Sequence, residues 1–163
     1  MLQKKICILG PTGVGKTSLV KQYVEGIFSE KYLTSIGVKI DKKRVDLSPT
    51  PVQMMLWDLE GIDKYCGFNP RYLRGAAAYI IVADQTRTTS LSEAMEIHSE
   101  ARNHTDVPAI LAINKSDLTA SSTWDVAKVD AHSSVFHKRF ITSAKSGEQV
   151  EDMFAFIAKT ITD

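Results

Sequence analysis

A glycine-rich segment near the amino terminus carries the residues best suited to chemistry. Residues 10–17 read Gly-Pro-Thr-Gly-Val-Gly-Lys-Thr. Gly13 and Gly15 let the backbone bend tightly, so that successive N–H groups can point at one chain of phosphates. Lys16 adds an ammonium group for the outer phosphates, and the hydroxyl of Thr17 suits a Mg²⁺ ion. The segment therefore predicts a phosphate-binding loop.

The sequence on both sides of this loop supports that interpretation. An apolar run at residues 6–9 precedes it, and apolar residues at helical spacing follow over residues 19–27. In this strand–turn–helix context the helix start adds unpaired N–H groups and the positive end of its dipole. A glycine-rich turn with a chance lysine is the alternative, and it explains neither flank. The expected phosphate ligands are Gly13, Val14, Gly15, Lys16, Thr17 and Ser18.

The overall composition excludes several classes of protein. The 163 residues suffice for one domain with a sizeable core, which we expect to span residues 1–163. The 20 basic residues are balanced by 19 acidic ones, so neither nucleic acid nor an anionic membrane is expected as the main partner. Cys7 and Cys66 are too few for a disulfide framework, which fits a reducing, cytoplasmic compartment.

The sequence offers no motif for membrane insertion or lipidation. No apolar stretch has transmembrane length, and the amino terminus enters the first expected strand without a signal peptide. Leu2 excludes the myristoylation motif, and the carboxyl terminus lacks a prenylation cysteine. We therefore expect a cytoplasmic protein, peripheral to a membrane only if a lipidated tail exists outside this chain.

Apolar runs alternate with helical patterns along the chain, which predicts a largely parallel sheet covered on both faces, an α/β fold. The hairpin formed by the second and third strands would add one antiparallel edge strand. Ligands of such sheets bind beyond the carboxyl ends of the strands. Strands are expected at residues 3–9, 38–47, 52–57, 76–83, 109–113 and 139–142. Helices are expected at residues 16–26, around 91–101, at 123–135 and at 150–161, with a short helical stretch before residue 76.

A second motif, Asp58-Leu59-Glu60-Gly61, follows the third expected strand. A carboxylate at this position can hold Mg²⁺ through water, and the N–H group of Gly61 can face a γ-phosphate. On its own the pattern Asp-x-x-Gly favours a plain acidic turn over a functional motif. It gains meaning from the phosphate-binding loop before it.

Two further motifs follow the fifth and sixth expected strands. The first reads Asn114-Lys115-Ser116-Asp117. A carboxylate can accept two N–H bonds from the edge of guanine, whereas adenine leaves it without donors, so Asp117 predicts guanine selectivity. The second motif, residues 143–145, reads Ser-Ala-Lys and can present a backbone N–H group to the base oxygen.

Taken together, these motifs resemble the Ras superfamily of small GTPases, and its Rab-like members most closely. The resemblance rests on residues 10–17, 35–38, 57–58, 72–76, 114–117 and 142–145. It implies the P-loop NTPase G domain, with a six-stranded, mostly parallel sheet, one antiparallel edge strand and five helices on both faces. It also implies GTP and GDP as substrate and product, Mg²⁺, and two loops that change shape with the γ-phosphate. Effectors, exchange factors and GTPase-activating proteins would be the partners.

The resemblance also implies roles for individual residues. Phe28 would pack against guanine and Asp117 would recognise it, while Asn114 and Lys115 shape the pocket. An ordinary buried aromatic is the alternative for Phe28. The implied catalytic residues are Lys16, Ser35 and Gly61; the guanine site comprises Phe28, Asn114, Lys115, Asp117, Ser143, Ala144 and Lys145; the Mg²⁺ ligands are Thr17, Ser35 and, through water, Asp58; and the effector patch comprises Ile40, Trp57 and Tyr72. For the three patch residues, a place in the core is the alternative.

Three positions depart from the usual pattern of that superfamily. Ser35 stands where threonine is usual; it keeps the hydroxyl but lacks the methyl group, which predicts a looser first switch loop. Ile62 stands where a glutamine orients the attacking water, which predicts slow intrinsic hydrolysis unless Asp63 or Glu60 takes over. Thr12 stands where glycine or serine is common, and its branch would crowd an incoming arginine finger.

Three hypotheses for function follow from these observations. The leading one is a GTP/GDP-dependent molecular switch with slow hydrolysis. The second is a nucleotide-locked scaffold with negligible hydrolysis, which Ile62 favours. The third, a P-loop kinase for a small acceptor, leaves the two guanine motifs without a role, and only a preference for ATP over GTP would support it. His98 is expected to be a packed or half-exposed helix residue rather than a metal ligand.

Overall fold

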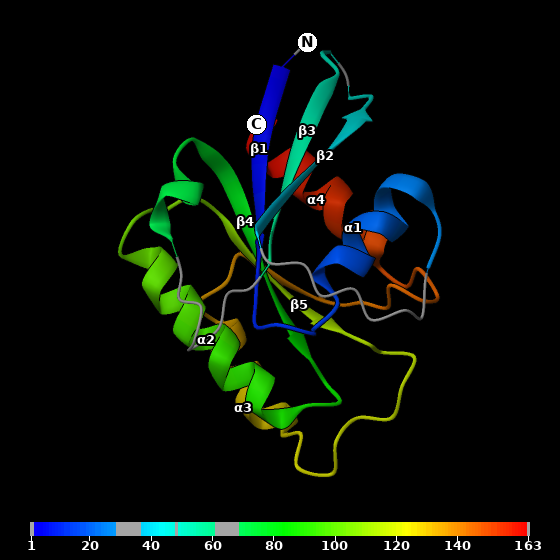
Figure 1. Ribbon diagram of the computed structural model, residues 1–163, viewed down its shortest axis with the longest axis vertical. Helices are drawn as coiled ribbons and strands as arrows, with labels where there is room; N and C mark the ends of the chain where they lie inside the picture. Colours follow the sequence, from blue (N-terminus) through cyan, green and yellow to red (C-terminus); the bar gives the residue numbers. More distant parts are fainter. Residues whose placement is uncertain (1, 29–36, 48, 61–68, 163) are drawn as a thin grey trace.

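The computed structural model describes residues 2–28, 37–47, 49–60 and 69–162 (Figure 1). Five of the six strands run parallel, in the order β2-β3-β1-β4-β5-β6, and the edge strand β2 pairs antiparallel with β3. The strands are β1 (Leu2–Leu9), β2 (Gly37–Val45), β3 (Val52–Glu60), β4 (Ala76–Asp84), β5 (Ala109–Asn114) and β6 (Lys138–Ile141). The helices are α1 (Lys16–Glu25), η1 (Pro70–Leu73), α2 (Thr88–Arg102), α3 (Val126–Ser133) and α4 (Val150–Thr162).

The central strands are apolar on both faces because helices cover both. Every residue of β5 is buried, as are the last seven of β4. Helices α1 and α4 pack on one face, around Ile6 and Ile8, and helices α2 and α3 pack on the other, around Cys7 and Leu9 (Figure 1). Successive residues of a strand point to opposite faces, so neighbouring residues of β1 enter different cores. The expected α/β fold with a mostly parallel sheet and one antiparallel edge strand is confirmed.

The helix count differs slightly from the expected five. The described residues contain four α-helices, and the fifth helical element, η1, is a 3₁₀ turn of four residues. Asn69 caps η1 by accepting a hydrogen bond from the backbone N–H of Arg71 at 3.0 Å. Gly75 then adopts a φ of 77°, and β4 begins at the next residue. Because Gly75 has a left-handed conformation and β4 begins directly after it, the helical stretch cannot extend further towards β4.

Two element boundaries moved for identifiable reasons. Strand β3 continues three residues beyond the predicted Trp57, because the start of β2 pairs with Asp58 and its successors. Helix α3 begins at Val126, three residues later than predicted. The carboxylate of Asp125 caps it, accepting the N–H of Ala127 at 2.9 Å and of Lys128 at 3.4 Å.

His98 lies in the core rather than at a metal site. Its Nδ1 is 2.9 Å from the hydroxyl of Tyr79, and its ring stacks on Phe136 with the centroids 4.3 Å apart. Burial, with a smaller contribution from the positive charge of Arg102, lowers the pKa of His98 from 6.5 to about 4. The expectation of a packed helix residue is confirmed. No group of three metal-ligating side chains occurs within the described residues.

Acid is expected to destabilise the protein through His98. Because its pKa is about 4 in the folded state and near 6.5 when unfolded, the unfolded chain binds more protons between these values. The contribution of His98 to stability is therefore fully present above pH 6.5 and is lost as the pH falls. Once the pH is below 4, the free energy of unfolding is lower by about 3 kcal/mol. Urea unfolding at pH 7, 5 and 4 measures this loss. A His98→Gln variant has no titrating group at this position and keeps polar atoms that can bond to Tyr79. Its loss of stability between pH 7 and pH 4 should therefore be smaller by about 3 kcal/mol. Equal losses in the two proteins would contradict the assignment of this effect to His98.

Candidate functional site

The predicted phosphate-binding loop connects β1 to α1 in a tight turn that only glycine permits. Gly10 and Gly15 have φ values of 150° and 99°. A Cβ atom at Gly10 would lie 2.6 Å from the carbonyl oxygen of Val82, and one at Gly15 would lie 2.4 Å from Nδ2 of Asn114. Both positions therefore require glycine for conformation and for space. Gly15 immediately precedes the first residue of α1, so the loop ends at the positive end of that helix.

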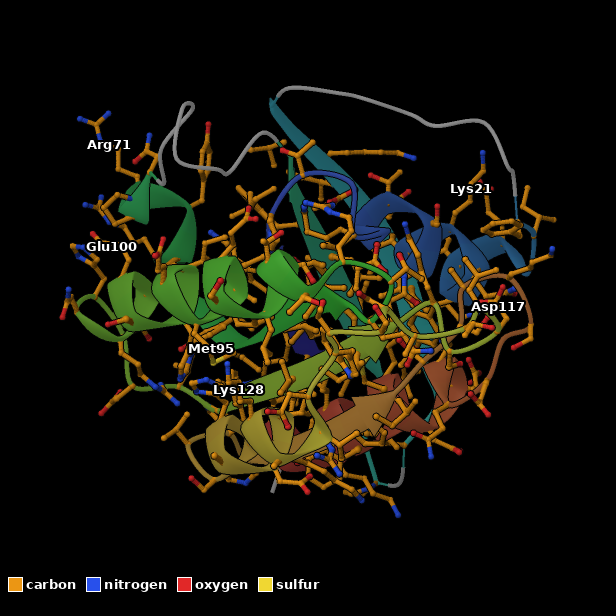
Figure 2. The ribbon with its side chains drawn as sticks, turned by 90° about the horizontal axis from the view of Figure 1, so that it is seen from below. Lys21, Arg71, Met95, Glu100, Asp117 and Lys128 are labelled. Atoms are coloured by element: carbon orange, nitrogen blue, oxygen red, sulfur yellow. The ribbon has the colours of Figure 1, made fainter. Side chains whose placement is uncertain are left out.

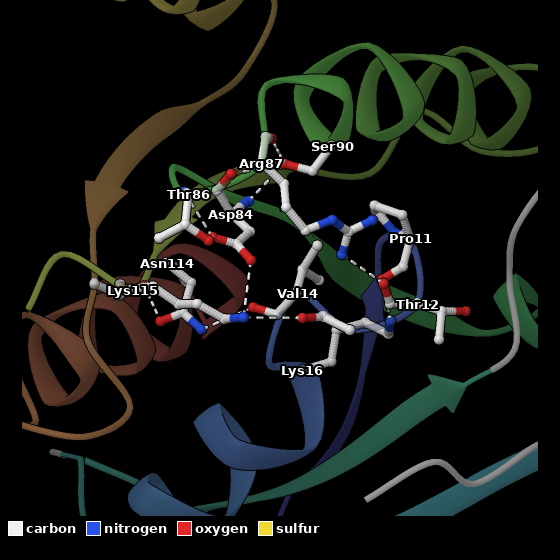
Figure 3. A network of polar contacts seen from close by, with 12 residues as sticks. Pro11, Thr12, Val14, Lys16, Asp84, Thr86, Arg87, Ser90, Asn114 and Lys115 are labelled. Carbon is white, nitrogen blue, oxygen red and sulfur yellow. Dashed lines mark hydrogen bonds and ion pairs between the residues drawn. The ribbon is translucent and has the colours of Figure 1, made fainter. Parts of the chain in front are cut away.

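Side chains from within the loop and from the end of β5 hold the carbonyl groups of this loop. Nζ of the buried Lys16 donates to the carbonyl oxygens of Gly10 and Pro11, at 2.9 Å each. Asn114 Nδ2 donates to the carbonyl oxygen of Val14 at 2.9 Å, and Lys115 Nζ to that of Gly13 at 3.2 Å (Figure 3). Asn114 also accepts a 3.2 Å hydrogen bond from the hydroxyl of Thr142. These contacts bring together the motifs at the ends of β1 and β5.

The carbonyl contacts also orient the N–H groups of the loop. In a planar trans peptide the C=O and the following N–H point in opposite directions. When Lys115 holds the carbonyl of Gly13 and Asn114 that of Val14, the N–H groups of Val14 and Gly15 face away from those side chains. A loop with fixed N–H groups is suited to bind an anion. The side chain of Val14 is itself buried in the core, so only its backbone is available to a ligand.

A hydroxyl and a carboxylate meet beside this loop. Thr17 Oγ1 donates to Oδ2 of Asp58 at 2.5 Å, and Asp58 is buried within β3. Hard oxygen ligands of this kind are what Mg²⁺ prefers, usually completed by water and by phosphate oxygens of a substrate. The donor set therefore fits the ion that the sequence predicts. Ser35 and Gly61, the other residues expected here, lie outside the described residues, and so does Ile62.

The carboxylate that should recognise guanine is exposed and held in place from one side. Asp117 Oδ1 accepts a 2.8 Å hydrogen bond from the hydroxyl of Ser143, which is buried and also accepts the N–H of Ser146 at 3.0 Å. This contact joins the motifs that follow β5 and β6. Asp117 lies at the opposite end of the molecule from Arg71 and Glu100 (Figure 2). Its carboxylate is thus positioned by the protein yet open to a ligand.

The remaining predicted guanine ligands lie around the loop that follows β6. Ala144 is buried, and its carbonyl oxygen accepts a 2.7 Å hydrogen bond from Gln22 of α1. Lys145 is exposed in the same loop. Phe28 follows α1 and is 38% exposed, so it is not an ordinary buried aromatic. Its contact with a base stays a prediction.

Sequence reasoning missed a buried carboxylate at the end of β4 and an arginine shortly after it. Asp84 is fully buried and forms a 2.8 Å ion pair with Lys115, while its other oxygen accepts the N–H and hydroxyl of Thr86. Arg87, at the start of α2, donates from Nη1 to the carbonyl oxygen of Thr12 at 2.9 Å (Figure 3). An aspartate directly after an unbroken apolar strand was the available signal for Asp84, because strand ends are where ligands bind. No pattern marked Arg87.

The predicted effector patch is partly exposed. Ile40 of β2 and Trp57 of β3 are paired across the two strands and therefore share one face of the sheet. Ile40 is 46% exposed, while Trp57 is half-buried under the ammonium group of Lys5, 3.8 Å from its ring centroid. Tyr72, in η1, is also half-buried. The face is accessible, and its use by a partner stays a prediction.

Comparison with known proteins decides the family. The model of the Ras family matches residues 5–163. The chain belongs to the Ras family. Among its relatives, the Ras-related protein Rab-22A of Mus musculus is 34% identical over 162 residues, which cover 96% of this chain and 82% of the relative. The Ras-related protein Rab5 of Nicotiana tabacum is 34% identical over 168 residues, covering 98% of this chain and 82% of the relative.

Membership in the Ras family confirms the resemblance to a Rab-like small GTPase. It supports the general assignment of a GTP-binding switch whose reaction is GTP hydrolysis. None of the helices in the described part of the chain has both the length and the apolar character needed to cross a bilayer.

Proposed function

We propose that residues 1–163 form a single G domain that binds GTP and GDP with Mg²⁺ and acts as a slowly hydrolysing molecular switch. The observation that carries this proposal is the direct bonding of the guanine motif to the phosphate loop. Asn114 and Lys115 donate to the carbonyl oxygens of Val14 and Gly13, so one structural unit would hold base and phosphates together. Such coupling is what a ligand containing both groups requires.

Binding of the nucleotide is assigned to two ends of this unit. The N–H groups of residues 13–18 and the ammonium of Lys16 would bind the phosphates. Asp117 would accept two hydrogen bonds from the guanine edge, supported by Ser143. Thr17, Ser35 and, through water, Asp58 would hold Mg²⁺, which when bound neutralises negative charge on the phosphate oxygens.

The switch itself is assigned to the two segments that contain Ser35 and Gly61. Contact of both with a γ-phosphate would order them in the GTP state, and loss of that phosphate would release them. The partly exposed face with Ile40, Trp57 and Tyr72 adjoins both segments in sequence and would read out the state to an effector. Exchange factors and GTPase-activating proteins are the other partners proposed, and the cytoplasm, or a membrane surface through a tail outside this chain, is the proposed location.

The simplest test is to identify the nucleotide that remains bound during purification. Denaturing the purified protein and separating the released nucleotides should yield GTP or GDP. GTP would support slow hydrolysis, and GDP would support ordinary cycling. Competition of ADP with GDP on equal terms would contradict the proposed function.

Replacing Ile62 with glutamine is expected to speed up hydrolysis. Isoleucine has no donor or acceptor with which to orient water, and restoring a polar group at this position should raise the single-turnover rate by roughly 10- to 100-fold. Hydrolysis of bound [γ-³²P]GTP by stoichiometric protein measures the rate. Val135→Gln, at a residue 58% exposed beyond the site, introduces the same side chain elsewhere and should leave the rate unchanged. An Ile62→Gln rate equal to that of the wild type would show that Asp63 or Glu60 already positions the water.

A nucleotide-locked scaffold with negligible hydrolysis is the second candidate, because Ile62 favours it. The same single-turnover assay distinguishes the slowly hydrolysing switch from the scaffold. If wild-type protein consumes its bound GTP within minutes and without a partner, the scaffold hypothesis fails.

A further inference from the structure

Arg87 contacts the phosphate loop from a part of the chain that carries no nucleotide motif. Its Nη1 donates to the carbonyl oxygen of Thr12 at 2.9 Å, across 75 positions of sequence. The side chain is half-buried and reaches from the start of α2 over the loop (Figure 3). It joins Lys115 and Asn114, so that the three consecutive carbonyls at residues 12–14 each accept a hydrogen bond from a different side chain.

The backbone from which Arg87 extends is fixed by the turn after β4. The N–H of Arg87 donates to the carbonyl of Asp84 at 3.0 Å. The buried hydroxyl of Ser90 lies 2.7 Å from the carbonyl oxygen of Arg87 and 2.8 Å from that of Asp84, and it accepts the N–H of Asp84 at 2.9 Å. The same Asp84 forms the ion pair with Lys115. One turn therefore sets the position of two cations that bind the loop.

The peptide geometry gives the Arg87 contact a consequence on the other side of the loop. Thr12 C=O and Gly13 N–H belong to one planar trans peptide and point in opposite directions. Holding the carbonyl towards Arg87 turns the Gly13 N–H away from it, as Lys115 and Asn114 do for the next two N–H groups. Gly13 has a φ of 83°, and glycine has the widest backbone freedom of all residues. A hydrogen bond from Arg87 to the preceding carbonyl therefore has most effect on the orientation of the N–H at this position.

We propose that Arg87 is a positioning residue for the phosphate chain of the nucleotide: by holding the carbonyl of Thr12 it aims the N–H of Gly13 at the phosphates. The inference rests on the proposed function, because it requires a nucleoside di- or triphosphate in the loop. It assigns Arg87 to recognition of the phosphates and gives it no part in recognition of the base, which is assigned to Asp117 after β5.

Removal of the guanidinium should therefore weaken binding without changing base selectivity. The Arg87→Ala variant is expected to release GDP roughly tenfold faster, because the loss of one hydrogen bond from a charged donor corresponds to about a tenfold change. Inosine diphosphate lacks the 2-amino group that one Asp117 oxygen would accept, so the ratio of GDP to inosine diphosphate affinity reports on the base. That ratio should be unchanged in Arg87→Ala. Arg71→Ala removes an exposed arginine at the far end of the molecule and should release GDP at the wild-type rate (Figure 2).

A spectroscopic measurement separates positioning from general loosening of the fold. With ¹⁵N-glycine labelling, the nine glycine amides of the GDP-bound protein can be followed individually. The Gly13 amide proton should move upfield in Arg87→Ala, because a weaker hydrogen bond to phosphate deshields it less, while Gly147, beyond β6, keeps its shift. Arg87→Lys retains a charged donor and should show a smaller change in both the amide shift and the release rate.

The outcomes distinguish failure of this inference from failure of the proposed function. If wild-type protein binds neither GTP nor GDP, the proposed function fails. If the wild type binds GDP but Arg87→Ala releases it within twofold of the wild-type rate, or leaves the Gly13 amide unmoved, the role of Arg87 is overturned and the proposed function stands. If Arg87→Ala does not fold, the same two criteria apply to Arg87→Met, which keeps an apolar stem but has no hydrogen-bond donor.

Discussion

Replacing Asp117 with alanine is expected to lower GDP affinity by about 10²- to 10⁴-fold, because two hydrogen bonds between a carboxylate and the guanine edge are lost at roughly 1.5–3 kcal/mol each. The affinity for ADP should change little, since adenine offers that carboxylate no matching donors. The preference for guanine over adenine would therefore largely disappear. Competition binding with fluorescent GDP, displaced by GDP or ADP, measures both affinities.

The structure supplies a control for the loss of charge and a reason to expect an intact fold. Asp117 is exposed, and its side chain accepts a hydrogen bond from Ser143, so alanine creates no cavity. Asp106→Ala removes an exposed carboxylate from the loop after α2 and should leave both affinities unchanged. An undiminished preference for guanine in Asp117→Ala would remove the basis for the assigned base site.

Replacing Lys16 with methionine is expected to weaken binding of GDP and GTP by about 10²- to 10³-fold. Methionine retains most of the apolar stem but lacks the ammonium group, whose charge-assisted bonds to phosphate oxygens contribute roughly 1.5–3 kcal/mol each. The variant also loses the two bonds from Nζ to the carbonyls of Gly10 and Pro11, which bend the loop back over the side chain. Unlike Asp117→Ala, it should weaken GDP and ADP alike.

Equilibrium titration with fluorescent GDP measures this effect. Lys128→Met, at an exposed position on α3, makes the same change of side chain away from the site and should bind as the wild type does. Circular dichroism of the variant checks that β1 and α1, which flank the loop, remain folded. A Lys16→Met protein that binds GDP within tenfold of the wild type would exclude the proposed contact with phosphate.

Local sequence determined the elements and the motifs. Gly13 and Gly15 were predicted to let the phosphate loop bend, and the structure gives both a positive φ and shows that a Cβ at Gly15 would overlap Asn114. The apolar runs of β4 and β5 predicted buried central strands because burial on both faces excludes polar side chains. Asp58, Asn114 and Asp117 were found because their motifs lie at or just beyond the carboxyl ends of parallel strands, which meet at one edge of the sheet.

Tertiary structure alone decided which distant side chains complete the site. Arg87 and Asp84 hold the loop and Lys115 through contacts that no short pattern encodes, and the Gln22 bond to the carbonyl of Ala144 spans 122 positions. The low pKa of His98 likewise results mainly from burial, and its ring contacts Tyr79 and Phe136 from elsewhere in the chain. Periodicity and motif spacing arise from neighbours along the chain, whereas these contacts depend on how the sheet orders its strands. This is why the sequence predicted the chemistry of the phosphate loop but not the side chains that hold its carbonyl groups.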